Sequence, residues 1–180
     1  MKRYSFCPVC GAGLPPAAQH GGIVGIHTCA SCGFEFWQNS KPAVGALVVR
    51  AIDTVPHVLL TRRGIDPFKD FWDVPGGYLE NGEHPHDGLM REMREELRAE
   101  VKILHLVAAE IDAYPREDVA EEARFVLSLY YRCDLASEGP LVPGDDVVEA
   151  RWFPLWTLPD RLAFESNRKA LALLRSLVSH

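Results

Sequence analysis

The sequence predicts an α/β domain that follows a small metal-binding segment. Short runs of β-branched and aromatic residues, bounded by turn residues, recur through the middle of the chain and are typical of strands. Apolar residues at helical spacing appear from about Pro85 and again over residues 164–178, which indicates two helices. The first segment carries two pairs of cysteines and is too short to build a core of its own. We therefore expect two domains, residues 1–40 and residues 41–180.

The composition is that of a soluble globular protein, because the 180 residues are 47% hydrophobic and 24% charged. A formal net charge of −6 disfavours nucleic-acid binding that ignores sequence, since such binding needs a basic surface. The longest apolar run, residues 43–49, is far too short to span a bilayer, and the N-terminus lacks the apolar core of a signal peptide. We expect a cytoplasmic protein with no membrane partner, and a homodimer is left open.

Two Cys-X-X-Cys-Gly motifs each form a tight turn that directs two thiolates at one point. Their cysteines are Cys7, Cys10, Cys29 and Cys32. Four sulfurs make a closed tetrahedral Zn²⁺ site, which would be structural and would provide most of the segment's folding energy. The segment is similar to a zinc ribbon. Two disulfides and two redox motifs are the alternatives, but the redox motif lacks its βαβ context. His20 and His27, in the intervening loop, are substitute ligands that four cysteines make unnecessary.

Aromatic residues follow the second cysteine pair in a partly alternating pattern, at Phe34, Phe36 and Trp37. We interpret them as the last strand of the ribbon, packed on the next domain. A base-stacking surface is the alternative. The linker between the domains should end near Pro42.

The second domain is expected to begin with a β-hairpin. Residues 43–50 and 57–61 are apolar, β-branched runs joined by a turn at 53–56. Segment 112–122 is polar and acidic and contains Pro115, so we expect a loop of functional length. Further strands are predicted at 101–111, 123–133 and 149–153, and the closing helix at 164–178.

The chemistry is expected on the first helix. Glu92, Glu95 and Glu96 stand at i, i+3 and i+4, which is one face of an α-helix. Clustered like charges repel one another unless cations lie against them, and carboxylate oxygens are ligands that hard divalent cations such as Mg²⁺ prefer. The helix is anchored by an apolar stripe of Leu89, Met93 and Leu97.

This stretch resembles the Nudix box, which has a Gly, five residues, Glu, seven residues, and then Arg-Glu-apolar-X-Glu-Glu-X-Gly-apolar. The matching positions are Gly77, Glu83, Arg91, Glu92, Met93, Glu95, Glu96 and Ala99. Arg98 replaces the second-last Gly of the box, which would ordinarily end the helix in a left-handed turn. We therefore expect this helix to end differently or to run slightly longer.

The resemblance implies the Nudix α/β/α sandwich, in which a mixed sheet lies between helices. It also implies a hydrolase that depends on Mg²⁺ or Mn²⁺, with Glu92, Glu95 and Glu96 as metal ligands. The backbone carbonyl of Gly76 would be a further ligand, and Gly77 would lie against the substrate.

Glu83 and Arg91 are expected to orient this catalytic cluster through a salt bridge. The box does not fix the general base. The candidates are Glu95 and the carboxylates of the acidic loop, Glu117, Asp118, Glu121 and Glu122.

Arg62 and Arg63 end a predicted strand just before the Gly-rich loop. The guanidinium fork is suited to bracing a diphosphate, so both are candidate substrate-binding residues, with plain surface charge as the alternative. Because adjacent residues of a strand point to opposite faces, at most one of them should matter strongly.

Two further stretches, residues 41–45 and 162–166, resemble zinc-ribbon Nudix hydrolases that cleave diphosphates such as NADH, ADP-ribose and FAD. The NADH-cleaving branch has a Ser-Gln-Pro-Trp-Pro-Phe-Pro stretch after the box, and residues 110–115 here differ from it. We expect hydrolysis of a nucleoside diphosphate linked to another moiety, which releases a nucleoside monophosphate. A triphosphate-cleaving housekeeping enzyme and a non-catalytic binding or regulatory module are the alternatives, and the intact glutamates disfavour the module.

Overall fold

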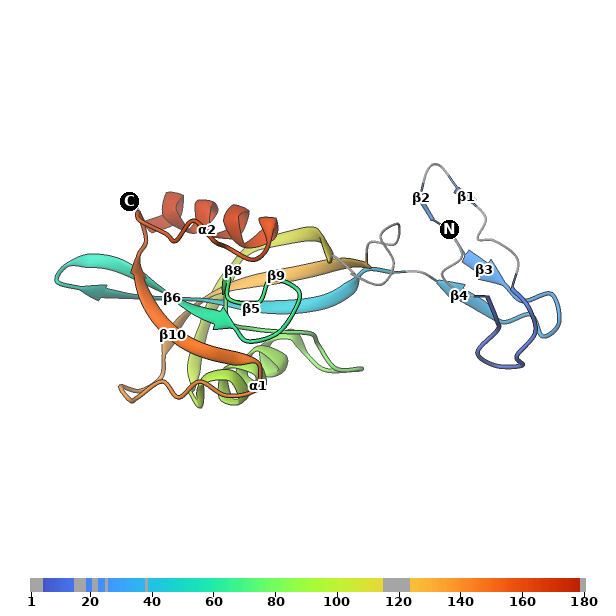
Figure 1. Ribbon diagram of the computed structural model, residues 1–180, viewed down its shortest axis with the longest axis horizontal. Helices are drawn as coiled ribbons and strands as arrows, with labels where there is room; N and C mark the ends of the chain where they lie inside the picture. The colour runs from blue at the N-terminus through green and yellow to red at the C-terminus, as the bar shows by residue number, and fades with distance from the viewer. Residues whose placement is uncertain are drawn as a thin grey trace. The chain divides into compact units, whose positions relative to one another are not determined.

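The computed structural model describes residues 5–14, 19–20, 23–24, 26–37, 39–114 and 124–178. The described residues form two compact units, one of the residues up to Ser40 together with Arg124, and one of residues 41–114 and 125–178 (Figure 1). The division into domains at residues 40 and 41 stays a prediction. In the described part of the chain, none of the helices has the length and apolar character needed to cross a membrane.

The first unit is made of short strands and two cysteine turns. Strands β1 (Gln19–His20) and β2 (Ile23–Val24) pair with each other, as do β3 (Ile26–Thr28) and β4 (Glu35–Trp37). The predicted strand at the aromatic residues is therefore confirmed as β4. Its packing on the second domain stays a prediction. The histidines expected in a loop lie instead in β1 and β3.

The second unit is built on one mixed sheet. Its strands are β5 (Lys41–Ile52), β6 (Val55–Arg63), β7 (Trp72–Asp73), β8 (Val101–Tyr114), β9 (Arg124–Leu135) and β10 (Val147–Pro154). The order across the sheet is β10-β6-β5-β9-β8, with β7 paired to β6. Strand β5 is parallel to β9 and antiparallel to β6, so the predicted mixed sheet is confirmed.

Two helices cover opposite faces of this sheet, α1 (Pro85–Leu97) and α2 (Glu165–Val178) (Figure 1). Successive side chains of central strand β5 alternate between the two faces. Val44, Ala46 and Val48 pack in the cluster with the apolar stripe of α1. Leu47 and Val49 pack in the other cluster, with Leu171 and Leu174 of α2. This arrangement is the expected α/β/α sandwich, and it explains why β5 reads as a continuous apolar run.

The strands are longer than the sequence pattern indicated. The predicted hairpin is present, but β5 and β6 extend until only Asp53 and Thr54 remain between them, both with positive φ (49° and 66°). Strand β8 continues to Tyr114, so the expected loop does not begin at Asp112. The rest of that loop, including its four candidate bases, lies outside the described residues.

Helix α1 begins at Pro85, as predicted, and ends in a left-handed turn at Arg98 that the sequence did not indicate. The ring Nδ1 of His84 accepts a hydrogen bond from the amide of His86 at the N-terminus. At the other end, Arg98 adopts the left-handed conformation (φ 52°), and its amide bonds the Arg94 carbonyl at 2.9 Å. The expectation of a different or longer end was wrong, because Arg98 takes the backbone conformation that a Gly would supply.

We predict that Arg98→Gly stabilises the protein by about 1 kcal/mol, because the left-handed conformation strains any residue that has a Cβ. Urea unfolding would measure this change. Arg98→Ala is the matched control, since it removes the same side chain but keeps the Cβ. Equal stability of the Gly and Ala variants would contradict the explanation.

Candidate functional site

The glycine-rich loop lies against central strand β5 and brings backbone close to α1. Amide–carbonyl bonds from Val44 to Gly77 (2.9 Å) and from Ala46 to Pro75 (2.8 Å) fix the loop on β5. A Cβ on Gly76, whose φ is 142°, would lie 2.1 Å from the Val44 carbonyl oxygen. A Cβ on Gly77 would lie 2.6 Å from the Glu92 carboxylate. Position 76 therefore requires glycine, whereas a side chain at position 77 would displace the Glu92 carboxylate.

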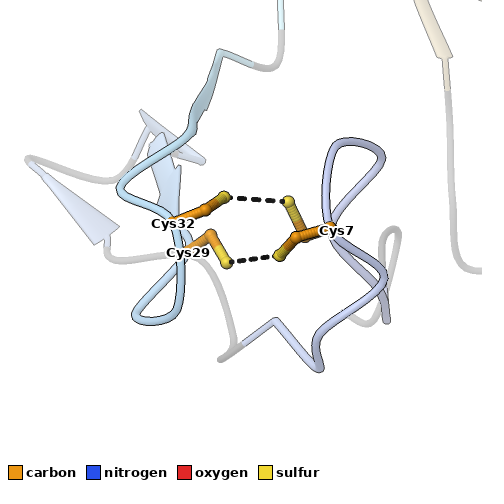
Figure 2. A group of neighbouring side chains, drawn as sticks. Cys7, Cys29 and Cys32 are labelled. Carbon is orange, nitrogen blue, oxygen red and sulfur yellow. Dashed lines mark hydrogen bonds between the residues drawn. The ribbon is translucent and has the colours of Figure 1, made fainter.

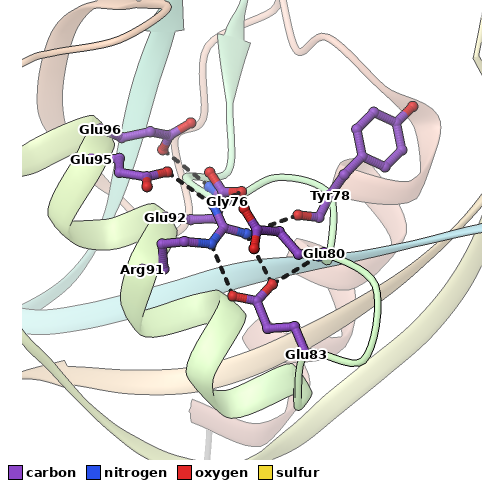
Figure 3. Close-up of polar contacts among 8 residues, drawn as sticks. All are labelled: Gly76, Tyr78, Glu80, Glu83, Arg91, Glu92, Glu95 and Glu96. Carbon is purple, nitrogen blue, oxygen red and sulfur yellow. Dashed lines mark hydrogen bonds and ion pairs between the residues drawn. The ribbon is translucent and has the colours of Figure 1, made fainter.

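Arg91 lies at the centre of the polar face of α1 (Figure 3). Its Nε and one terminal nitrogen bond the two carboxylate oxygens of Glu83 at 2.9 and 3.0 Å, which confirms the expected salt bridge. The other terminal nitrogen bonds Glu92 at 2.8 Å and Glu95 at 2.9 Å. These hydrogen bonds lower the pKa of Glu83 to about 2 and raise the pKa of Arg91. The pair therefore stays charged across the physiological range.

The three box glutamates differ in burial and partners. Glu92 and Glu96 are buried, whereas the Glu95 side chain is 48% exposed. Glu96 accepts a hydrogen bond from the amide of Gly76 at 3.0 Å, which ties the helix to the glycine-rich loop (Figure 3). Burial raises the pKa of Glu96 well above its usual range, and the charges of Asp73 and Asp146 raise it further. Burial also raises the pKa of Glu92.

This concentration of buried negative charge is costly unless a cation neutralises it. Arg91 neutralises part of it but does not reach Glu96, whose hydrogen-bond partner is a backbone amide. The donor set of carboxylates on one helix face fits a hard divalent cation. In the described structure Glu92 and Glu95 share one terminal nitrogen of Arg91, whereas Glu96 bonds the amide of Gly76.

A cavity of about 150 Å³ opens at the glycine-rich loop, and no residue of α1 lines it. The glycine-rich loop forms part of its wall through Gly76, Gly77 and Tyr78. Acidic residues from three other segments also line it, namely Asp73, Asp112 and Asp146. A bound molecule in this cavity would lie against Gly76 and Gly77, which also contact Glu96 and approach Glu92.

A buried hydrogen-bond network forms the far wall of the cavity. Asp73 accepts hydrogen bonds from the Asn167 side-chain amide (2.6 Å), from Arg63 (2.8 Å) and from the amide of Val74 (2.9 Å). The hydroxyl of Tyr130 bonds Asn167 at 2.8 Å. Burial raises the pKa of Asp73, while the charge of Arg63 opposes that shift. The network therefore joins the end of β6, the glycine-rich loop, β9 and the start of α2.

The same network continues to β8. The Tyr130 hydroxyl also bonds the Ser166 hydroxyl at 3.0 Å, and the Ser166 amide donates to the Asp112 carboxylate at 3.0 Å. Sequence reasoning did not single out Asp73, Asp112, Tyr130 or Asn167. Ser166 was noted only within the resemblance at residues 162–166. Their proximity depends on sheet order, which no local pattern encodes.

The two arginines singled out from the sequence have different surroundings. Arg62 bonds Asp70 at 2.9 Å and Glu149 at 3.0 Å, and it does not line the cavity. Arg63 lines the cavity, bonds Asp73 and stacks over the Phe164 ring at 5.3 Å. Arg63 is thus the one of the two that lines the cavity, and the expectation that at most one arginine matters strongly stays a prediction. The role of Arg63 toward a substrate also stays a prediction.

A loop before β10 adds two carboxylates that the sequence analysis missed. The amide of Gly144 bonds the carbonyl of Glu96 at 2.8 Å, and a Cβ on Gly144 would lie 2.9 Å from the carbonyl of Glu95. This close packing brings Asp145 and Asp146 toward the glutamates, whose pKa values they help to raise. The sequence signal was the Asp-Asp pair directly after Pro-Gly.

The four N-terminal cysteines converge as their spacing predicted (Figure 2). All of their sulfurs lie within 4.8 Å of one another, and two of the separations are 3.6 and 3.7 Å. A tetrahedral zinc with Zn–S bonds of about 2.3 Å has sulfur–sulfur separations of about 3.8 Å, so this cluster fits Zn²⁺. A disulfide needs about 2.05 Å, and the cysteines are free thiols here. An amide hydrogen bond from Cys32 lowers the pKa of Cys29 to about 7, whereas, despite an amide hydrogen bond from Phe34, the Cys10 thiol and burial raise the pKa of Cys32 to about 12.

Comparison with known proteins agrees with this geometry. A family model described as the NUDIX domain matches residues 39–174. An ADP-ribose pyrophosphatase of Methanocaldococcus jannaschii is 36% identical over 62% of this chain and 62% of its own length. An NAD-capped RNA hydrolase NudC of Pseudomonas fluorescens is 25% identical over 94% of this chain, which spans 55% of that protein. The chain thus spans less than two thirds of either relative.

A solved structure has the same architecture. The crystal structure of a NUDIX hydrolase from Nitrosomonas europaea aligns with a TM-score of 0.72 and 27% identity, over 93% of this chain and 88% of that one. The family match covers most of the chain, and the glutamate helix, glycine-rich loop and mixed sheet lie within it. The chain therefore belongs to the Nudix hydrolase family.

Proposed function

We propose that the protein hydrolyses the diphosphate of a nucleoside diphosphate linked to another moiety and releases a nucleoside monophosphate, using Mg²⁺ or Mn²⁺. The observation that carries this proposal is that Glu92 and Glu96 are buried against the glycine-rich loop, and that the same loop lines a cavity. Such a loop brings backbone close to phosphate, while the glutamates offer oxygen ligands for a cation.

Glu92, Glu95 and Glu96 would hold the cation, with the carbonyl of Gly76 as a further ligand. A bound divalent cation neutralises the charge of the diphosphate and activates water toward it. Glu83 would keep Arg91 in place beside Glu92 and Glu95. This positioning role follows from the two hydrogen bonds that join Glu83 to Arg91.

We propose two described carboxylates as candidates for the general base, and Glu95 would take this role in place of its role as a cation ligand. Glu95 is the most exposed of the box glutamates, and Asp146 lines the cavity. Hydrolysis needs a base within hydrogen-bond reach of the attacking water. Asp146 joins the candidates because the loop at Gly144 holds it beside Glu96.

The names of the relatives support an ADP-ribose or NAD type of substrate. The 36% identical relative is an ADP-ribose pyrophosphatase, which favours ADP-ribose. The NudC relatives match more of this chain and favour an NAD-type diphosphate as the second candidate. The stretch at residues 110–115 disfavours NADH, since it differs from the sequence of the NADH-cleaving branch.

A substrate panel would decide among these. ADP-ribose, FAD, NADH and nucleoside triphosphates should each be incubated with Mg²⁺ or Mn²⁺, and the products separated by chromatography. Release of a nucleoside monophosphate from a linked diphosphate would support the proposal. Cleavage of triphosphates alone would support the housekeeping alternative, and no cleavage of any compound would support a binding module.

The N-terminal unit is proposed to be a zinc ribbon with a structural Zn²⁺ held by its four cysteines. A site with four protein ligands leaves no open position for a substrate. The zinc therefore has no part in the proposed hydrolysis.

Glu96→Gln should lower turnover about a hundredfold or more, because the change removes one charged ligand with little change in shape. Without added divalent cation the variant should be more stable than the wild type, since burial already disfavours the charged Glu96. Steady-state kinetics and thermal unfolding would measure both effects.

The matched control is Glu100→Gln, an equivalent change just beyond α1, where Glu100 is exposed and pairs with Arg94. It should leave turnover unchanged. Near-normal turnover of Glu96→Gln at saturating Mg²⁺ would exclude Glu96 as a ligand.

The purified protein should contain about one zinc per chain, the number that a four-thiolate site accommodates. Cys29→Ser should release this zinc and unfold the first domain, while activity falls less than in Glu96→Gln. Elemental analysis would measure the metal. Cys133→Ser is the control. Cys133 is buried in the core beside α1, so its substitution should leave the zinc content unchanged. A metal-free protein with two disulfides would overturn the assignment.

Arg63→Ala should raise KM for the cleaved diphosphate about tenfold to a hundredfold, the loss expected for one charge-assisted hydrogen bond. It should also destabilise the fold by about 3–5 kcal/mol, because buried Asp73 loses its cation. Kinetics must therefore be measured at a temperature at which the variant is folded. Arg62→Ala is the control and should cost less than about 1 kcal/mol, since its ion pairs are more exposed. An unchanged KM in both variants would exclude both arginines from substrate binding.

A further inference from the structure

Helix α2 carries two polar residues on the face that it buries against the sheet. Ser166 and Asn167 are 3% and 2% exposed, and they share that face with Ala170, Leu171 and Leu174. A buried polar side chain destabilises a fold unless hydrogen bonds compensate for the water that it loses. The contacts of Asn167 therefore indicate what this residue does.

The side-chain amide of Asn167 joins two buried groups from other elements. Its nitrogen donates to the Asp73 carboxylate at 2.6 Å, and its oxygen accepts a hydrogen bond from the Tyr130 hydroxyl at 2.8 Å. An ionised carboxylate can only accept, whereas a carboxamide offers both a donor and an acceptor. Asn167 therefore matches both neighbours at once, which neither an ionised Asp nor a Leu at this position would do.

Asp73 in turn holds the beginning of the glycine-rich loop. The carboxylate oxygen that accepts from Asn167 also accepts from the amide of Val74 at 2.9 Å. Two residues further along the chain, the amide of Gly76 donates to Glu96. The position of the Asp73 carboxylate therefore affects the backbone that meets the glutamate helix.

Backbone hydrogen bonds join the same two regions independently of Asn167. The Trp72 amide donates to the Arg161 carbonyl, and the Ala163 amide donates to the Trp72 carbonyl, both at 2.8 Å. These bonds attach β7 to the segment just before α2. A substitution at Asn167 leaves their donors and acceptors in place, so it should disturb the Asp73 carboxylate without detaching α2 from the sheet.

We propose that Asn167 is a positioning residue for the hydrolysis. Its amide holds the Asp73 carboxylate, and this carboxylate holds the loop backbone where Gly76 meets Glu96. This role rests on the proposed function, because the hydrolysis assigns Glu96 to the cation. It requires no contact between Asn167 and the substrate.

The first test is Asn167→Asp, which keeps the shape of the side chain and replaces the donor toward Asp73 with a carboxylate oxygen. Two carboxylates in one buried site do not both ionise readily, so the pair keeps one proton up to a raised pKa. Below that pKa the proton replaces the amide hydrogen bond, and turnover should be close to that of the wild type. Above it the two charges repel, and turnover should fall about tenfold to a hundredfold, the cost of displacing a catalytic group.

Other charged or titratable groups face this pair and are the same in both proteins. They are Arg63, Glu96, Asp112, Tyr130 and Asp146. The turnover of the variant is therefore divided by that of the wild type at each pH, from about pH 6 to about pH 9. Ala172→Asp is the matched control, because it adds the same charge to the exposed face of α2. Its ratio to the wild type should not change with pH.

Two further variants test the role without a new charge. Asn167→Leu has neither donor nor acceptor, so it should lower turnover at every pH and change KM less. Tyr130→Phe removes only the hydroxyl that bonds the Asn167 oxygen, and it should lower turnover by a smaller factor. Circular dichroism would show that each variant is folded.

Hydrogen exchange of the Val74 and Gly76 amides tests the same role without any hydrolysis. In Asn167→Leu, and in Asn167→Asp at high pH, these amides should exchange about tenfold faster or more than in the wild type at the same pH, because the loop opens more readily. Ala172→Asp should leave their exchange unchanged. If the wild type cleaves none of the compounds, the proposed function fails, and hydrogen exchange alone decides the role of Asn167.

Two results would overturn the assignment. One is a ratio of Asn167→Asp to wild-type turnover that stays constant with pH. The other is exchange of the two loop amides that is the same in the Asn167 and Tyr130 variants as in the wild type.

Discussion

The polar half of the candidate site depends on the guanidinium of Arg91. This one group bonds three carboxylates, those of Glu83, Glu92 and Glu95, and also the carbonyl of Tyr78. Without it, negative charges on adjacent turns of α1 would face each other with little water to screen them. The same contacts connect the helix to the loop before it, because Tyr78 and Glu83 belong to that loop. Arg91 therefore fixes the loop and the helix as one unit.

The glycine-rich loop connects this unit to the buried network around Asp73. The Val74 amide bonds Asp73, and two residues later the Gly76 amide bonds Glu96. One short stretch of backbone is thus held from both sides, by an acidic helix face and by a network anchored on α2. A ligand in the cavity would lie against that stretch. A shift of α1 or of the network around Asp73 would therefore move the same backbone atoms. The network thereby joins residues as far apart in sequence as Asp73 and Asn167.

Local patterns predicted the parts of the fold whose causes are local. Helical spacing placed the three glutamates on one face of α1, alternating apolar residues indicated β9, and cysteine spacing predicted the convergence of the four thiols. The far wall of the cavity could not be predicted in this way, because Tyr130 reaches Asn167 only through the parallel pairing of β5 with β9 and the packing of α2 on the sheet. The end of α1 was missed for a related reason. Arg98 accepts the strain of a left-handed conformation, since tertiary packing there outweighs the preference of a single residue.

The contacts of Arg91 also explain how a cation could enter a site that is already neutralised in part. Nε and one terminal nitrogen are held by Glu83, whose low pKa of about 2 keeps that pair charged. The other terminal nitrogen alone contacts Glu92 and Glu95. The proposed cation would compete only with this second set of contacts, so Arg91 could release the two ligands without leaving its place. Arg91 does not contact Glu96, so the cation would not compete with Arg91 for this ligand. Neutralising Glu96 would also be the most favourable, because Glu96 is the most deeply buried of the three carboxylates.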